Sequence, residues 1–216
     1  MKKTALIITA AGQGLRFGGN IPKQFIKIGD KTILQICCNK FKNIPEISEI
    51  IITSEKSQLK NIENQMQEIG LVCTIIEGGA TRAESVYNAF KILKNTDSVM
   101  IHDAVRPHVS EALIQGLLKE AKNKKAVIPV IPITDTVKFV ENNKVMKTMP
   151  REKLFCVQTP QIFDFKLLSQ AYAKALLGDA AIFTDEAKLI EEINENVYII
   201  PGETSNMKIT TKEDLH

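Results

Sequence analysis

Apolar stretches rich in isoleucine, leucine and valine alternate with helix-like stretches through residues 5–130. The strand-like stretches are 5–9, 47–53, 71–76, 98–102 and 126–130. The helix-like stretches between them are 33–41, 55–69, 81–93 and 111–123. Continuous apolar strands between helices are typical of a parallel sheet covered on both faces. This pattern predicts an α/β fold whose ligands bind at the carboxyl ends of the strands, where the strand order reverses.

A segment of small residues, AAGQGLR at 10–16, follows the first apolar stretch, and PKQ follows at 22–24. Glycines and alanines let backbone N–H groups come close to a phosphate. Arg16 and Lys23 add two positive charges beside this loop. Together these residues predict a polyphosphate site.

Two well-known phosphate loops do not match this segment. A P-loop ends in Gly-Lys-Ser or Gly-Lys-Thr, and neither tripeptide occurs in the sequence. A dinucleotide-binding loop has a third glycine where this chain has Phe17.

Two further motifs follow strand-like stretches. GGATRAES at 78–85 opens a helix, whose N-terminus favours an anion or base oxygens, and Ser85 offers a hydroxyl there. HDAVRP at 102–107 places Asp103 as an expected Mg²⁺ ligand beside a polyphosphate, and Arg106 can bind a second anion. A capped turn and a structural Asp–Arg pair are the alternatives that need no ligand.

The alternation ends after residue 130. Residues 132–153 contain two short β-prone pieces around the turn ENN at 141–143, which predicts a protruding hairpin arm. An exposed β-rich protrusion is often a dimerisation element, and a surface hairpin without a partner is the alternative.

The residues beyond the arm contain three more motifs: TPQIF at 159–163, TDEA at 184–187 and NMKIT at 206–210. We expect helices at 165–176 and 185–192, strands at 197–201 and 207–210, and Thr211 as a helix cap.

Composition favours one domain over residues 1–216. The net charge of +3 argues against a nucleic-acid or membrane partner, and no apolar run approaches a membrane span. We therefore expect a cytoplasmic protein. The four cysteines have no CxxC spacing and are expected to be core thiols: Cys37, Cys38, Cys73 and Cys156.

Taken in order, these motifs resemble those of the cytidylyltransferases that act on 2-C-methyl-D-erythritol 4-phosphate. The resemblance rests on AAGQGLR with PKQ, GGATRAES, HDAVRP, DTVK, TPQIF, TDEA and NMKIT. It implies a single, three-layer, Rossmann-like nucleotidyltransferase domain with a dimerisation arm. The implied reaction joins CTP and 2-C-methyl-D-erythritol 4-phosphate to give 4-diphosphocytidyl-2-C-methyl-D-erythritol and pyrophosphate, in isoprenoid precursor synthesis. The resemblance also implies Mg²⁺ as cofactor and a homodimer.

The resemblance implies a role for each matching residue. The backbone at four positions would hold the CTP phosphates: Ala10, Ala11, Gly12 and Gly14. Four residues would surround cytosine and ribose: Gly79, Ala80, Ser85 and Ala104. The catalytic residues would be Arg16, Lys23, Arg151 and Lys208. Asp103 would hold Mg²⁺ and, with Arg106, Thr136 and Thr184, bind the polyol phosphate. Thr136 and Arg151 would reach it from the partner subunit's arm.

Three other functions stay open at this point. A ribitol 5-phosphate cytidylyltransferase would share the nucleotide site and differ in the polyol pocket. A regulatory protein could bind the nucleotide without catalysis, although it could then lose Arg16, Lys23, Asp103 or Lys208. A nicotinamide oxidoreductase is the third alternative.

Overall fold

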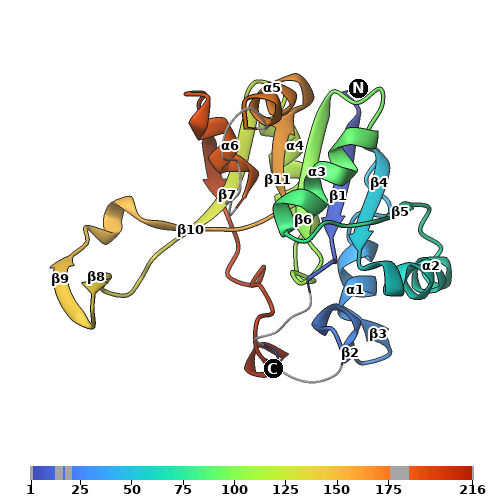
Figure 1. The fold of residues 1–216 in the computed structure, drawn as a ribbon, viewed down its shortest axis with the longest axis horizontal. Helices are drawn as coiled ribbons and strands as arrows, with labels where there is room; N and C mark the ends of the chain where they lie inside the picture. Colours follow the sequence, from blue (N-terminus) through green and yellow to red (C-terminus); the bar gives the residue numbers. More distant parts are fainter. Residues whose placement is uncertain (1, 13–16, 18–20, 176–184, 216) are drawn as a thin grey trace.

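The computed structural model describes residues 2–12, 17, 21–175 and 185–215. Within these residues, eight strands form one mixed, mostly parallel sheet (Figure 1). Its order is β10-β7-β11-β6-β1-β4-β5, and β12 also pairs with β7. The strands are β1 (Thr4–Thr9), β4 (Ile47–Ser54), β5 (Thr74–Glu77), β6 (Ser98–Asp103), β7 (Ala126–Pro132), β10 (Phe155–Val157), β11 (Gln161–Asp164) and β12 (Tyr198–Pro201).

Helices cover both faces of this sheet. The α-helices are α1 (Ile33–Asn39), α2 (Leu59–Glu68), α3 (Arg82–Ile92), α4 (Glu111–Glu120), α5 (Phe165–Ala175) and α6 (Glu186–Glu192). Single-turn 3₁₀ helices occur at Lys23–Phe25, Lys56–Gln58, Arg151–Lys153 and Lys212–Leu215, and a small hairpin pairs β2 (Lys27–Ile28) with β3 (Lys31–Thr32).

The central strand β1 shows why the sequence makes three layers. Its side chains alternate between the two faces, as in any strand. Leu6 and Ile8 pack with residues of α1, α2 and α4, whereas Ala5 and Ile7 pack with residues of α3, α5 and α6. All four are fully buried. The predicted α/β fold with a three-layer, mostly parallel sheet is confirmed.

Five of the described α-helices begin after a residue whose side chain caps them. In each case the side-chain oxygen accepts a hydrogen bond from the backbone N–H three residues later, which satisfies a donor that the helix leaves unpaired. The caps are Thr32 of α1, Thr81 of α3, Ser110 of α4, Asp164 of α5 and Asp185 of α6.

The strand order reverses at β1. Strands β4 and β5 lie on one side of β1, and β6 lies on the other. Thr9 pairs in register with Thr53 of β4 and with Asp103 of β6, all in parallel. The carboxyl ends of three strands therefore meet at one edge, where α/β proteins bind ligands.

A hairpin of β8 (Lys138–Glu141) and β9 (Lys144–Thr148) stands away from the sheet, within the residues predicted to form an arm (Figure 1). Its turn contains Asn142 at φ 48° and Asn143 at φ 60°. Asparagine tolerates this left-handed region better than most residues.

Several details differ from the sequence-based predictions. The predicted strand at 207–210 is wrong: the segment is extended, and Ile209 N–H bonds to Val105 O without forming a ladder. Thr211 directly precedes the 3₁₀ helix Lys212–Leu215, and its backbone O accepts Asp214 N–H at 3.4 Å, while Asp214 Oδ2 accepts the N–H groups of Thr210 and Thr211. Cys156 is exposed on β10 and is not a core thiol.

Candidate active site

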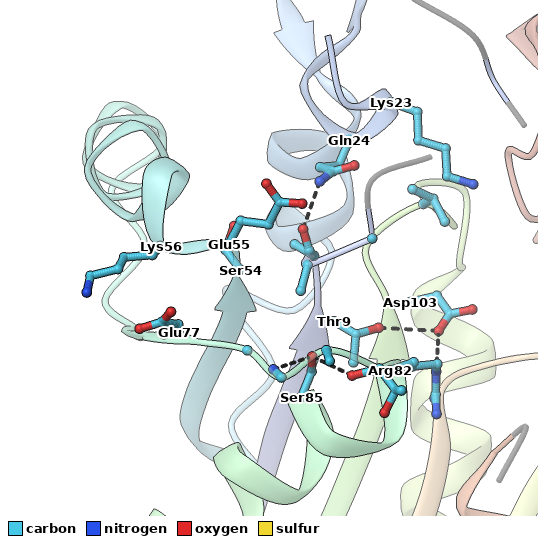
Figure 2. A pocket seen from close by; sticks show the side chains of 18 of the residues that line it. Thr9, Lys23, Gln24, Ser54, Glu55, Lys56, Glu77, Arg82, Ser85 and Asp103 are labelled. Atoms are coloured by element: carbon cyan, nitrogen blue, oxygen red, sulfur yellow. Dashed lines mark hydrogen bonds and ion pairs between the residues drawn. The ribbon is translucent and has the colours of Figure 1, made fainter. Parts of the chain in front are cut away.

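A cavity of about 870 Å³ opens at the edge where β1, β4 and β6 end (Figure 2). Its volume suits a small-molecule ligand. The residues that were predicted for the site and line this cavity are Ala10, Ala11, Gly12, Lys23, Gly79, Ala80, Ser85, Asp103 and Lys208.

The other predicted residues do not line the cavity or are not described. Ala104, Arg106, Thr136 and Arg151 are outside its lining. Gly14, Arg16 and Thr184 lie outside the described residues.

The first loop of the site follows β1. Ala10 N–H donates to Thr53 O at 2.9 Å, and the buried Gln24 amide donates to Ala10 O at 2.8 Å. These bonds fix the start of the loop. A Cβ on Gly12 would meet no atom of the described part of the chain within 4 Å. A phosphate can approach such a backbone closely.

The second loop follows β5 and leads into α3. The Ser85 hydroxyl accepts from Gly79 N–H at 3.0 Å and donates to Thr81 O at 2.8 Å, while Ala80 N–H donates to Glu84 Oε2 at 2.7 Å. Ser85 and Glu84 therefore shape the loop from within. The resemblance had implied only a ligand contact for Ser85.

Asp103, the last residue of β6, is the most heavily contacted acid of the site. Its Oδ1 lies 3.2 Å from Arg82 Nε and 3.4 Å from Thr9 Oγ1. Its Oδ2 lies 2.7 Å from Lys208 Nζ and 4.0 Å from Arg106 Nε. Burial would raise the pKa of Asp103, but the charges of Arg82 and Lys208 outweigh burial and hold the pKa well below its usual range.

Arg82 also contacts a second acid, Glu186. Its Nη1 lies 3.0 Å from Glu186 Oε1 and 2.9 Å from Oε2. The Glu186 side chain is 1% exposed, and burial raises its pKa, although Arg82 opposes that shift. Arg82 and Glu186 belong to motifs that the sequence analysis quoted without giving them a role. Their separation of 104 residues left no sequence signal of the pairing.

His102 supports Asp103 from behind the cavity. It is fully buried, and its Nε2 lies 3.1 Å from Arg106 O while its Nδ1 lies 3.0 Å from Thr159 Oγ1. The same hydroxyl accepts from Asp103 N–H at 3.0 Å. These partners fit a neutral ring with the proton on Nε2, and burial lowers the pKa of His102 to about 4.

The extended segment at 206–210 lies beside the cavity. Lys208 from this segment reaches Asp103, and Lys23 Nζ donates to Ile209 O at 2.8 Å. Ile209 packs in a small apolar cluster with Phe17 and Ile33. The segment thus joins the two lysines that were predicted to be catalytic.

The Arg106 side chain bonds to backbone oxygens outside the lining of the cavity. Its Nη1 donates to Asn206 O at 2.8 Å, and its Nη2 lies 3.4 Å from Val157 O. Its predicted contact with the polyol phosphate stays a prediction.

Asp103 is the residue that suits a metal ion here. Across the described ranges, no group of three or more His, Cys, Asp or Glu side chains gathers as a metal site. Mg²⁺ commonly takes one or two carboxylates and completes its coordination with substrate phosphates and water. The single ionised carboxylate of Asp103 fits an ion that arrives with a polyphosphate, and does not fit one held by the protein alone.

In the described ranges, no helix is long and apolar enough to cross a membrane.

Thr136 and Arg151 are exposed on the arm, outside the cavity. Arg151 Nη1 donates to Thr134 O, close to Thr136 in the chain.

Comparison with known proteins agrees with this architecture. The model of the family "IspD: 2-C-methyl-D-erythritol 4-phosphate cytidylyltransferase" matches residues 4–216. The chain is 37% identical over 214 residues to the 2-C-methyl-D-erythritol 4-phosphate cytidylyltransferase of Halalkalibacterium halodurans. The alignment covers 98% of this chain and 93% of the relative.

Solved structures give the same result. The crystal structure of 4-diphosphocytidyl-2C-methyl-D-erythritol synthase from Anaerococcus prevotii superposes with a TM-score of 0.87 at 33% identity, covering 99% of this chain and 95% of that one. The cytidylyltransferase of Thermus thermophilus gives a TM-score of 0.79 at 30% identity, covering 100% and 96%. The chain belongs to the 2-C-methyl-D-erythritol 4-phosphate cytidylyltransferase family, a family of nucleotidyltransferases.

Proposed function

We propose that this chain transfers the cytidylyl group of CTP to 2-C-methyl-D-erythritol 4-phosphate. The products would be 4-diphosphocytidyl-2-C-methyl-D-erythritol and pyrophosphate, in isoprenoid precursor synthesis. The observation that carries the proposal is the position of Asp103 and Lys208, at the edge of a cavity lined by two glycine-containing loops. The expected cytoplasmic location and single domain over 1–216 stay predictions.

The nucleotide would lie across the two loops. The backbone of residues 10–12 would hold the phosphates, and the loop at 78–81 would face the base and ribose. Three buried polar atoms of residues lining the cavity have no hydrogen-bond partner among the described residues: Ser54 Oγ, Glu55 Oε1 and Arg82 Nη2. Because buried polar atoms are normally paired, these atoms support a polar ligand. Gly14, Arg16 and Ala104 keep their expected roles as predictions.

The reaction needs no nucleophilic side chain. A phosphate oxygen of the polyol phosphate attacks the α-phosphorus of CTP and forms a new P–O bond. The bond from that phosphorus to the oxygen bridging to the β-phosphate breaks, and pyrophosphate leaves with the electron pair. Two anions must meet, so catalysis depends on positioning and on neutralising negative charge. Lys23 and Lys208 are the described cations placed to do this.

Asp103 would hold Mg²⁺ when the nucleotide is bound. The ion would offset negative charge on the phosphates. Asp103 itself stays ionised, since the surrounding cations keep its pKa low.

We further propose a homodimer in which the arm of one subunit completes the site of the other. Thr136 and Arg151 are exposed on an element that stands away from the sheet (Figure 1). The same arm exposes four apolar side chains that a partner would cover: Phe139, Val140, Val145 and Met146. Arg106 and Thr184 would complete the contacts with the polyol phosphate.

The test is pyrophosphate release from CTP and Mg²⁺ with 2-C-methyl-D-erythritol 4-phosphate. Ribitol 5-phosphate is assayed in parallel as the competing acceptor. We expect release with the methylerythritol phosphate and little with ribitol phosphate. Release with ribitol phosphate alone would overturn the acceptor, and no release with either would overturn the proposed reaction.

A further inference from the structure

Arg82 occupies a position that local helix preferences do not explain. It is the first residue of α3, where the helix dipole favours acidic side chains over basic ones. Glu186 is likewise the first residue of α6, and both helices pack into the same apolar core. A basic residue that breaks a local rule points to a tertiary or functional reason for its presence.

Both acids accept hydrogen bonds from the guanidinium of Arg82. Nη1 donates to both oxygens of Glu186, at 3.0 and 2.9 Å, and Nε donates to Asp103 Oδ1 at 3.2 Å. Because a guanidinium is planar and rigid, fixing Nη1 also fixes the direction in which Nε points. Glu186 thereby determines where Arg82 holds Asp103, although Glu186 itself does not line the cavity.

Asp103 has a second cationic partner, Lys208, which differs from Arg82 in freedom. The Lys208 side chain is 39% exposed, compared with 23% for Arg82. Lys208 is a point charge on a flexible stem and contacts Asp103 Oδ2, whereas Arg82 is braced by a buried acid. Lys208 can therefore turn to a substrate phosphate while Arg82 keeps the carboxylate in place.

We propose that Arg82 and Glu186 are positioning residues for the transfer reaction, fixing the orientation of the Asp103 carboxylate while Lys208 exchanges between Asp103 and substrate phosphate. This inference rests on the proposed function. It assigns Arg82 and Glu186 no direct contact with the reacting atoms. The competing interpretation is an ion pair that only joins α3 to α6.

The two interpretations differ in a double variant. Arg82→Gln alone leaves Glu186 buried and unpaired, and Glu186→Gln alone leaves Arg82 without its brace, so each should lower Tm. Arg82→Gln with Glu186→Gln removes both charges and keeps polar groups that can pair. If the pair only joins the helices, the double variant regains both Tm and turnover. If the pair positions Asp103, it regains Tm and not turnover.

We expect the double variant to show kcat lowered by about tenfold to a hundredfold, the range for residues that orient a catalytic ligand. The KM for CTP should change by less than about threefold, because the two loops bind the nucleotide. Arg82→Lys is the alternative test of the positioning role if the double variant fails to fold. It keeps the charge but cannot contact both acids with fixed geometry, and its kcat should fall similarly. Lys188→Gln, which breaks an exposed ion pair on α6, is the matched control and should behave like the unchanged chain.

Turnover of the unchanged chain is measured first in the same assay. Its absence would overturn the proposed function and this inference together. Turnover by the unchanged chain, with kcat within about twofold of it in a folded double variant or in Arg82→Lys, would overturn only the positioning role.

Discussion

Lys23 and Lys208 come from distant parts of the chain, and each is already held by the protein beside the cavity. Lys23 donates to the backbone of Ile209, and Lys208 pairs with Asp103. A cation such as Lys23, in place before the ligand arrives, needs little reorganisation when negative charge gathers on a phosphoryl group.

Lys23→Ala should therefore lower kcat by about a hundredfold or more, the usual effect of losing one such preorganised group. Circular dichroism should show an unchanged fold. Lys31→Ala, on the exposed surface of β3, is the control and should leave turnover unchanged. A well-folded Lys23→Ala enzyme with near-normal turnover would contradict the assignment. We expect the same loss for Arg16→Ala, at a position outside the described residues.

His102 should make the fold sensitive to mild acid. Its pKa is about 4 in the folded chain against an ordinary 6.5, so the unfolded chain binds more protons between these values. Stability is therefore complete above about pH 6.5 and falls as the pH drops toward 4, by about 2 kcal/mol at pH 5. Thermal unfolding at pH 7 and pH 5 measures this loss.

Two variants separate His102 from general acid effects. His102→Gln should show a smaller fall in Tm between the two pH values. His108→Gln, at an exposed position, should keep the full difference. An equal fall in all three proteins would show that another group controls the acid sensitivity.

The loop between β5 and α3 is an element that depends on its glycines, Gly78 and Gly79. An added Cβ on Gly79 would lie 2.2 Å from Glu84 Cβ, closer than real contacts allow. Glu84 belongs to the first turn of α3 and bonds to Ala80 N–H, so the helix cannot yield without moving the loop.

Gly79→Ala should consequently weaken CTP binding by about tenfold or more, because about 1.4 kcal/mol of loop strain changes an equilibrium tenfold. Calorimetric titration with CTP measures the change. Gly116→Ala is the matched control. Gly116 lies within α4, and its added Cβ would be 3.8 Å from Ile200 Cδ1, an ordinary contact. Alanine favours a helix interior, so this variant should bind CTP normally and have a slightly higher Tm. Normal CTP binding by Gly79→Ala would contradict the loop's proposed role.

The sequence predicts the elements whose signals are local. Strands β1, β5 and β6 lie in apolar stretches, and residues of the motifs after them line the cavity. Strands β10 and β11 were not predicted, because each is short and is defined as a strand only by its pairing with strands distant in the sequence. The segment at 207–210 resembles a strand in sequence but lacks a neighbour along which to form a ladder. The ion pair of Arg82 with Glu186 could not be predicted for a related reason, since no local sequence signal links an acid and a base 104 residues apart.

At the scale of the whole molecule, the proposed dimer would build each site from two subunits. Thr136 and Arg151 do not line the cavity of their own subunit. If they act in the partner's cavity, one complete site needs the body of one chain and the arm of another.

Mixing two inactive variants tests this arrangement. Lys23→Ala damages the body, and Arg151→Ala damages the arm. Random exchange makes half of the dimers mixed, and each mixed dimer has one intact site, so about a quarter of full turnover should return. If each arm serves its own subunit, both chains of a mixed dimer stay damaged and no turnover returns. Co-purification of the untagged variant with an affinity-tagged copy of the other establishes in parallel that subunits have exchanged.

Three polar contacts of the site join residues that are far apart along the chain. Arg82 and Glu186 are 104 residues apart, Asp103 and Lys208 are 105 apart, and Lys23 and Ile209 are 186 apart. Contacts between distant residues form late during folding, because long loops must close first. During refolding from denaturant, the circular dichroism signal of the helices should therefore recover before pyrophosphate release does. For that interval the enzyme would have its helices but no working site.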